Sequence, residues 1–168
     1  MGDYLKLASG VPTDANANAT SAGAGDAGKI VKLDGSGKID STMMPIGVGA
    51  ETRSMTTSEA VAAGDLVNIH NSTGPKVRKA DATTAGKESH GFVLSSAGSG
   101  ASVTVYPEQA VISGLTGLTP GTRMFLATTA GTSTATAPST SGQVVQDIGY
   151  AISTTEILFN PRQPITLA

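Results

Sequence analysis

The chain has 168 residues, of which 13 are acidic and 11 basic, giving a net charge of −2. This balance argues against the basic surface that nucleic-acid binding or electrostatic membrane attachment needs, so we expect neither partner. The chain has no Cys, which excludes disulfides and thiolate metal sites. Charged residues make up 14% of it and aromatic residues 4%, beside 21 Gly and 8 Pro. This composition is typical of a turn-rich β protein with a modest core.

Residues 1–28 carry few large apolar side chains and are rich in Ala, Gly, Asn and Thr. Such a segment buries too little surface to offset the entropy lost on ordering, so we expect an arm or linker that a partner orders. The cluster Tyr4-Leu5-Lys6-Leu7 near its start has two interpretations. It is either a small anchor at the end of a tether or a frayed terminus.

Residues 29–40 predict a short strand–turn–strand unit, with the turn at 35–37 and Pro45 closing the segment. Two short strands alone are marginal in water, so we expect this unit to pack on another part of this chain or on another chain. We therefore assign residues 1–50 to an extended N-terminal arm. Its candidate partner-binding residues are Tyr4, Leu5, Leu7, Val11, Ile30, Val31, Leu33, Ile39, Met43 and Met44.

From residue 51 to residue 160, short apolar runs alternate with turn residues at the spacing of an all-β domain. Thr119-Pro120-Gly121 is a strong turn signal, and residues 58–65 are the one helical candidate. We predict an all-β fold, an antiparallel β-sandwich or small barrel of about eight strands. The N-terminal arm precedes it, and residues 161–168 follow as an extended tail. Tyr106 and Tyr150 lie in strand patterns, so we expect them in the core.

The residues that could carry chemistry form no convincing constellation. His70 and His90 have no partner at metal-ligand spacing, and Ser89 beside His90 lacks the nucleophile-elbow pattern. Residues 34–40 fail both the phosphate-loop and the calcium-loop patterns. The glutamates are scattered, and few aromatic residues are available as sugar platforms. We therefore expect no enzyme activity, metal, cofactor or small-molecule substrate.

Lys76 and Arg78 alternate along one predicted strand and share a face. They have two interpretations. Positive charges on an edge strand prevent wrong strand pairing, and the same charges could bind a phosphate or an acidic partner. The first interpretation is the commoner one.

Several segments together resemble capsid decoration proteins of tailed bacteriophages, which are also called cement or head-fibre-like proteins. In the N-terminal part these are residues 3–13 (DYLKLASGVPT), 27–40 (AGKIVKLDGSGKID) and 43–45 (MMP). In the remainder they are residues 63–68 (AGDLVN), 77–82 (VRKADA), 90–93 (HGFV), 117–121 (GLTPG) and 142–146 (GQVVQ). The resemblance spans nearly the whole chain and rests on the order of these motifs.

The resemblance implies a structural virion protein on the outer capsid surface, made in the cytoplasm of a bacterial host. Proteins of this kind are commonly homotrimers at three-fold or quasi-three-fold positions, where they bind the major capsid protein and cement neighbouring capsomers. A long N-terminal arm commonly carries part of that contact. The alternative is a head- or tail-fibre module that binds a host receptor or glycan.

Overall fold

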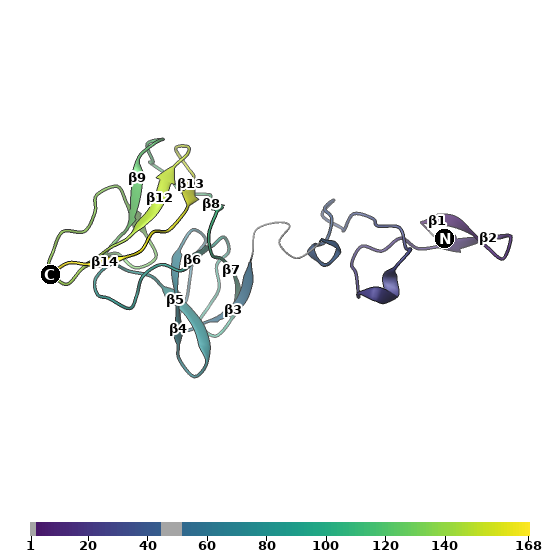
Figure 1. Cartoon of the computed structure of the whole chain (residues 1–168), viewed down its shortest axis with the longest axis horizontal. Helices are drawn as coiled ribbons and strands as arrows, with labels where there is room; N and C mark the ends of the chain where they lie inside the picture. The colour runs from purple at the N-terminus through teal and green to yellow at the C-terminus, as the bar shows by residue number, and fades with distance from the viewer. Residues whose placement is uncertain (1–2, 45–51) are drawn as a thin grey trace. The chain divides into compact units, whose positions relative to one another are not determined.

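The computed structural model describes residues 3–44 and 52–168. The chain divides into two compact units, Met1–Val48 and Gly49–Ala168, which we term the arm unit and the β domain (Figure 1). Pro45 and the predicted end of the arm at residue 50 lie outside the described residues.

The described chain is all-β, as the sequence predicts, with two single-turn 3-10 helices in the arm unit. The arm unit contains β1 (Tyr4–Ala8), β2 (Val11–Ala15), η1 (Ala24–Asp26) and η2 (Ser41–Met43). The β domain contains β3 (Arg53–Thr57), β4 (Leu66–Asn71), β5 (Pro75–Lys79), β6 (Gly91–Val93), β7 (Ser102–Tyr106), β8 (Ala110–Ile112), β9 (Arg123–Leu126), β10 (Ser133–Thr134), β11 (Val144–Val145), β12 (Asp147–Ala151), β13 (Ile157–Phe159) and β14 (Ile165–Thr166).

Five strands of the β domain close into a small barrel in the order β3-β5-β4-β6-β7. The β3–β5 pair is parallel, which departs from the expected antiparallel fold, and β3 closes the barrel against β7 in antiparallel register. A five-stranded barrel leaves little interior space, so small β-branched side chains fill it. The interior cluster is Val61, Val67, Val77, Val93, Val103 and Val105.

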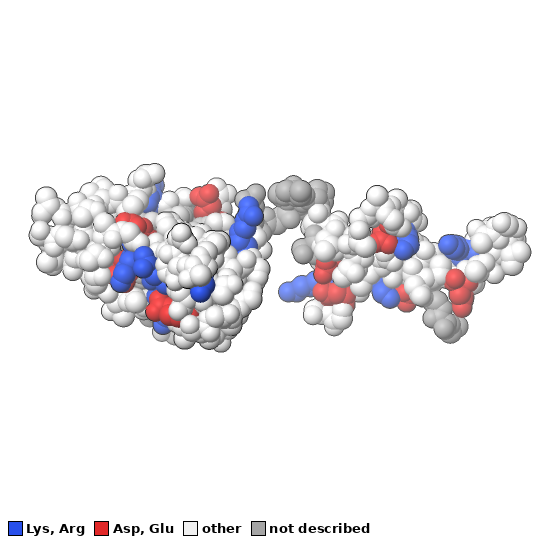
Figure 2. Space-filling model, turned by 90° about the horizontal axis from the view of Figure 1, so that it is seen from below, with Lys and Arg blue, Asp and Glu red and all other residues white. Residues whose placement is uncertain are grey.

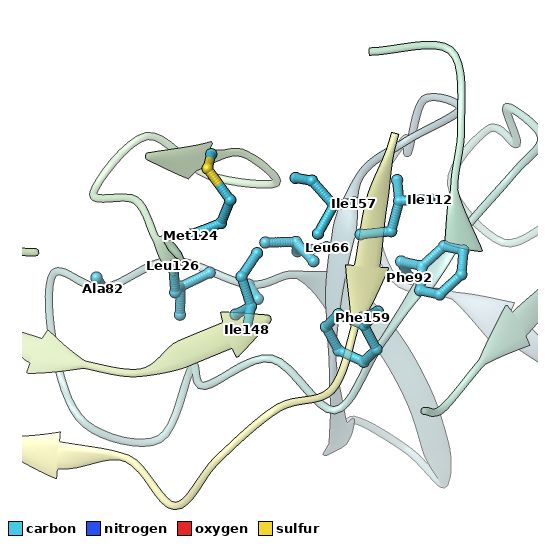
Figure 3. Close-up of a cluster of buried hydrophobic side chains, with 10 residues drawn as sticks. Leu66, Ala82, Phe92, Ile112, Met124, Leu126, Ile148, Ile157 and Phe159 are labelled. Carbon is cyan, nitrogen blue, oxygen red and sulfur yellow. The ribbon is translucent and has the colours of Figure 1, made fainter. Parts of the chain in front are cut away.

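A second sheet, in the order β10-β9-β12-β13-β8, shares a core with the barrel wall. Because strand side chains alternate between faces, Val67 and Val93 enter the barrel while Leu66 and Phe92 pack toward this sheet. The ring of Phe92 stacks on Tyr106 at 5.2 Å. It also meets the ring of Phe159 edge-on at 5.4 Å (Figure 3). This two-sided burial explains why adjacent residues are both apolar at Leu66-Val67 in β4 and at Phe92-Val93 in β6.

The structure corrects several details of the predicted β domain. Residues 58–65 are a connection and not a helix, and Val61 in it forms a bridge with Ala97. The predicted extended tail contains β14, which pairs with β11. Tyr106 is partly buried, but Tyr150 is 47% exposed because it faces outward from β12. The turn at Thr119-Pro120-Gly121 is confirmed, with Thr122 N–H donating to Thr119 O and Gly121 at φ 82°.

The arm unit contains a β-hairpin where no independent structure was expected. β1 and β2 pair in antiparallel register from Tyr4–Ala15 to Ala8–Val11. The two turn residues, Ser9 and Gly10, both have positive φ (51° and 82°), which is the geometry of the tight turns that favour hairpins. The sequence analysis did not foresee this hairpin, because it weighed burial and overlooked the Ser-Gly turn.

The predicted strand–turn–strand unit at residues 29–40 is also wrong, because the described structure has no strand there. Asp34 Oδ1 accepts hydrogen bonds from the backbone N–H groups of Ser36 and Lys38, and Asp34 N–H donates to Lys38 O. The side chain thus closes a tight local loop that starts no strand ladder. Val31 makes one isolated parallel bridge with Asn18.

Candidate functional site

The hairpin of the arm unit presents an uncovered apolar face. Its register pairs Leu5 with Asp14 and Leu7 with Pro12, so these four side chains share one face. Leu5 is 69% exposed and Leu7 is 73% exposed. Neighbouring large apolar side chains that remain this accessible mark a surface suited to a partner.

The other predicted contact residues of the arm are mostly exposed as well. Tyr4 and Met43 are partly buried. The exposed ones, at 40% to 62%, are Val11, Ile30, Val31, Leu33, Ile39 and Met44. Within residues 3–44, Ala17 is the one buried apolar side chain. The structure therefore does not gather the ten predicted residues into one pocket or core; they lie at separate places between residues 4 and 44.

Polar contacts, and not a core, hold the arm unit in its described conformation. The Asp3 carboxylate accepts hydrogen bonds from Ala17 N at 3.0 Å and from Lys32 Nζ at 2.7 Å. Asn18 N–H donates to Ile30 O, and Lys32 N–H donates to Asn18 O. The carboxylate thus fastens the beginning of the hairpin to the segment around Val31.

A second carboxylate organises the turn at η1. Asp26 accepts hydrogen bonds from Lys29 Nζ at 2.7 Å and from Ala22 N at 2.6 Å. The hydrogen bond from Lys29 and then the one from Ala22 lower the pKa of Asp26 to about 2. The hydrogen bonds from Lys32 and then Ala17 also lower the pKa of Asp3. Both groups stabilise the arm while they are ionised.

We expect the arm unit to loosen in acid before the barrel changes. A carboxyl group with a lowered pKa contributes stability above its ordinary pKa of 3.8, and that contribution is lost as the pH falls toward about 2. Amide NMR shifts of Ala22 should therefore titrate in this range while those of Val67 in the barrel stay constant. An Asp26→Asn variant should lack the titration at Ala22. A constant Ala22 shift in the parent chain down to pH 2 would contradict the account.

Ser89 and His90, which were considered as a catalytic pair and set aside, make hydrogen bonds within the β domain. The buried Ser89 hydroxyl donates to Gly91 O, and His90 Nδ1 accepts from Ile69 N–H at 3.0 Å. These contacts engage the two side chains separately. Neither contact aligns Ser89 as a nucleophile with His90 as its base.

A serine–histidine contact that the sequence analysis missed joins Ser58 and His70. Ser58 Oγ lies 2.8 Å from His70 Nε2 and donates to Val77 O at 3.2 Å. When the serine proton is directed to Val77 O, the histidine donates to the serine and does not act as its base. Burial is the main cause that lowers the pKa of His70, and the positive charge of Arg78 adds to it. No sequence signal could find this pair, because strand pairing brings it together.

The basic residues of β5 do not protect a sheet edge, so that interpretation is wrong. β5 is paired on both sides, with β3 and β4. Arg78 donates from Nε to Asn68 Oδ1 and from Nη2 to Gly86 O, and Lys79 Nζ lies 3.3 Å from Asp65. These two cations therefore stabilise the barrel wall. On the face in Figure 2, acidic and basic side chains of the β domain lie interspersed among wide uncharged areas.

Among the described residues, no three His, Asp or Glu side chains are grouped so that they could hold a metal ion. No helix found in residues 3–44 or 52–168 has the length and apolar character needed to cross a membrane. The chain matches no protein-family model, and no curated protein matches it.

Proposed function

We propose that the chain is a structural virion protein that decorates and cements the capsid of a tailed bacteriophage. In this proposal the arm, residues 1–50, binds the major capsid protein. The β domain forms a homotrimer at three-fold or quasi-three-fold positions on the outer surface. The observation that carries the proposal is the uncovered apolar face of the hairpin, in a unit whose described part has almost no core of its own. The sequence resemblance to decoration proteins supplies the class of partner.

The energetics of the arm suit binding to a large surface. Burying one leucine side chain contributes about 1.5–3 kcal/mol, so covering Leu5 and Leu7 offsets much of the cost of fixing the arm. The two-stranded sheet β1–β2 also leaves backbone groups on its outer edges for pairing with a partner strand. A trimer carries three arms, and binding through several arms at once increases the overall affinity for the capsid.

Co-sedimentation with capsids that lack the protein tests the proposal. The purified chain should bind saturably, and gel densitometry should count bound copies in multiples of three per site. Absence of binding to every capsid form, expanded or not, would overturn the proposal and direct the search to the tail and its fibres.

The second candidate is a head- or tail-fibre module that binds a host receptor or glycan. One observation favours it: Tyr150, expected in the core, is exposed on the outer face of the second sheet. Exposed aromatic rings supply contact area at low entropic cost. A glycan array without a hit would count against this candidate.

A further inference from the structure

A β-bulge in β12 brings two polar side chains onto the same outward face of the second sheet. Asp147 pairs with Phe125 and Tyr150 pairs with Arg123, and the register shifts between Asp147 and Gly149. In a regular strand, residues three apart point to opposite faces. The bulge adds one residue, so Asp147 and Tyr150 point the same way.

Gly149 fixes this bulge, and another residue would not fit. Its φ is 126°, and its N–H donates to Asp147 Oδ1 at 2.9 Å. A Cβ on Gly149 would lie 2.0 Å from the backbone oxygen of Leu158. The backbone of the bulge therefore holds the Asp147 carboxylate in place through this hydrogen bond.

The Asp147 carboxylate positions two arginines. Its Oδ2 lies 3.4 Å from Arg123 Nε and 3.6 Å from Arg162 Nε. Arg162 is further fixed because its backbone N–H donates to Asp147 O at 2.8 Å. The carboxylate is mostly covered, whereas the arginine side chains are 66% and 72% exposed. The cluster carries one net positive charge, and neither guanidinium donates a hydrogen bond to another group in the described chain.

These side chains border a small pocket. Its volume is about 190 Å³, and Gly121 and Asn160 complete its lining beside Arg123, Asp147, Tyr150 and Arg162. The pocket combines an aromatic ring, two forked donors, an amide and a carboxylate oxygen. A few polar groups beside an aromatic ring are the kind of lining that fixes the orientation of a small ligand.

We infer that this pocket binds an acidic sugar residue, a pyranose that carries a carboxylate. The guanidinium groups of Arg123 and Arg162 receive the carboxylate, because a planar fork of donors matches its two oxygens. Tyr150 lines the pocket and is 47% exposed, so its ring supplies an aromatic surface for the apolar side of the sugar. Asn160 also lines the pocket, and its amide is placed to hold a hydroxyl group, which a simple carboxylate lacks.

The net charge of the pocket does not suit a nucleic acid. One net positive charge is too small for a nucleic-acid backbone, whose binding requires many phosphate contacts. The inference rests on the glycan-binding candidate and not on capsid decoration, so capsid co-sedimentation and the test below can fail independently.

Amide NMR of the full chain tests the inference, with a hyaluronan tetrasaccharide, which contains glucuronic acid, as the probe. We expect saturable shift changes at Gly121, Gly149 and Tyr150. A neutral chitin tetrasaccharide should produce none of them, and sodium acetate should bind at least tenfold more weakly. A paired Arg123→Gln and Arg162→Gln variant should lose at least tenfold in affinity. Arg53→Gln, the same change on an exposed arginine of β3, should lose nothing.

Other results would each overturn a specific part of the inference. Shift changes confined to residues outside the pocket would leave glycan binding in place and eliminate this site. Equal binding of acetate would eliminate the sugar and leave an anion site, as would equal binding of a glutamate-rich peptide. An equal loss in the Arg53→Gln variant would show that the binding is unspecific charge attraction. Absence of any shift change with the tetrasaccharide would contradict the site and count against the glycan-binding candidate.

Discussion

Replacing Leu5 and Leu7 together by threonine is expected to weaken capsid binding by roughly a hundredfold. Each leucine contributes about 1.5–3 kcal/mol when it is buried against a partner, and a loss of about 3 kcal/mol corresponds to that factor. Threonine keeps the strand preference of β1, so the hairpin should persist. Co-sedimentation over a range of protein concentrations gives the dissociation constant.

The melting temperature should not change in this variant, because both leucines are exposed in the unit outside the β domain. Ile152→Thr is the matched control, since it removes an exposed apolar side chain from the β domain. That variant should bind capsids like the parent chain. A doubly substituted hairpin that binds as tightly as the parent would show that this face is not the contact.

Replacing Gly149 by alanine is expected to destabilise the β domain by about 3 kcal/mol. Alanine at positive φ costs about 1 kcal/mol, and displacing the backbone of β13 from the new Cβ costs about 2 kcal/mol more. The expected change in melting temperature is roughly −10 °C. Thermal unfolding followed by circular dichroism measures it.

Gly142→Ala separates the two causes. Gly142 also has positive φ, at 83°, but nothing lies within 4 Å of the position where its Cβ would be. This variant should therefore lose about 1 kcal/mol. Equal losses in the two variants would mean that the contact with Leu158 does not constrain the bulge.

The regular strands of the β domain could be predicted from the sequence, because their apolar runs and turn residues are local signals. The prediction of short apolar strands between residues 51 and 160 is confirmed by β4, β6 and β9 among others. The closure of five strands into a barrel could not be predicted. It depends on the parallel pairing of β3 with β5, which joins distant segments.

The two candidate sites also differ in whether the sequence could predict them. Exposed apolar residues in the arm followed from composition, since residues 1–28 offer too few apolar side chains to form a core. The pocket at Tyr150 could not be predicted from the sequence, because an alternating pattern assigns a side chain to one face of a sheet only where the strand is regular. The bulge at Gly149 reverses that assignment, and a single glycine in a strand does not reveal on its own whether a bulge occurs.

Deleting residues 1–28 and measuring capsid binding is the most direct test of the central claim that the arm binds the partner. The buried clusters of the β domain lie between residues 61 and 159, so the shortened chain should keep its fold and melting temperature. We predict that it loses most of its affinity for capsids in co-sedimentation beside the full chain. Binding as tight as that of the full chain would contradict the account.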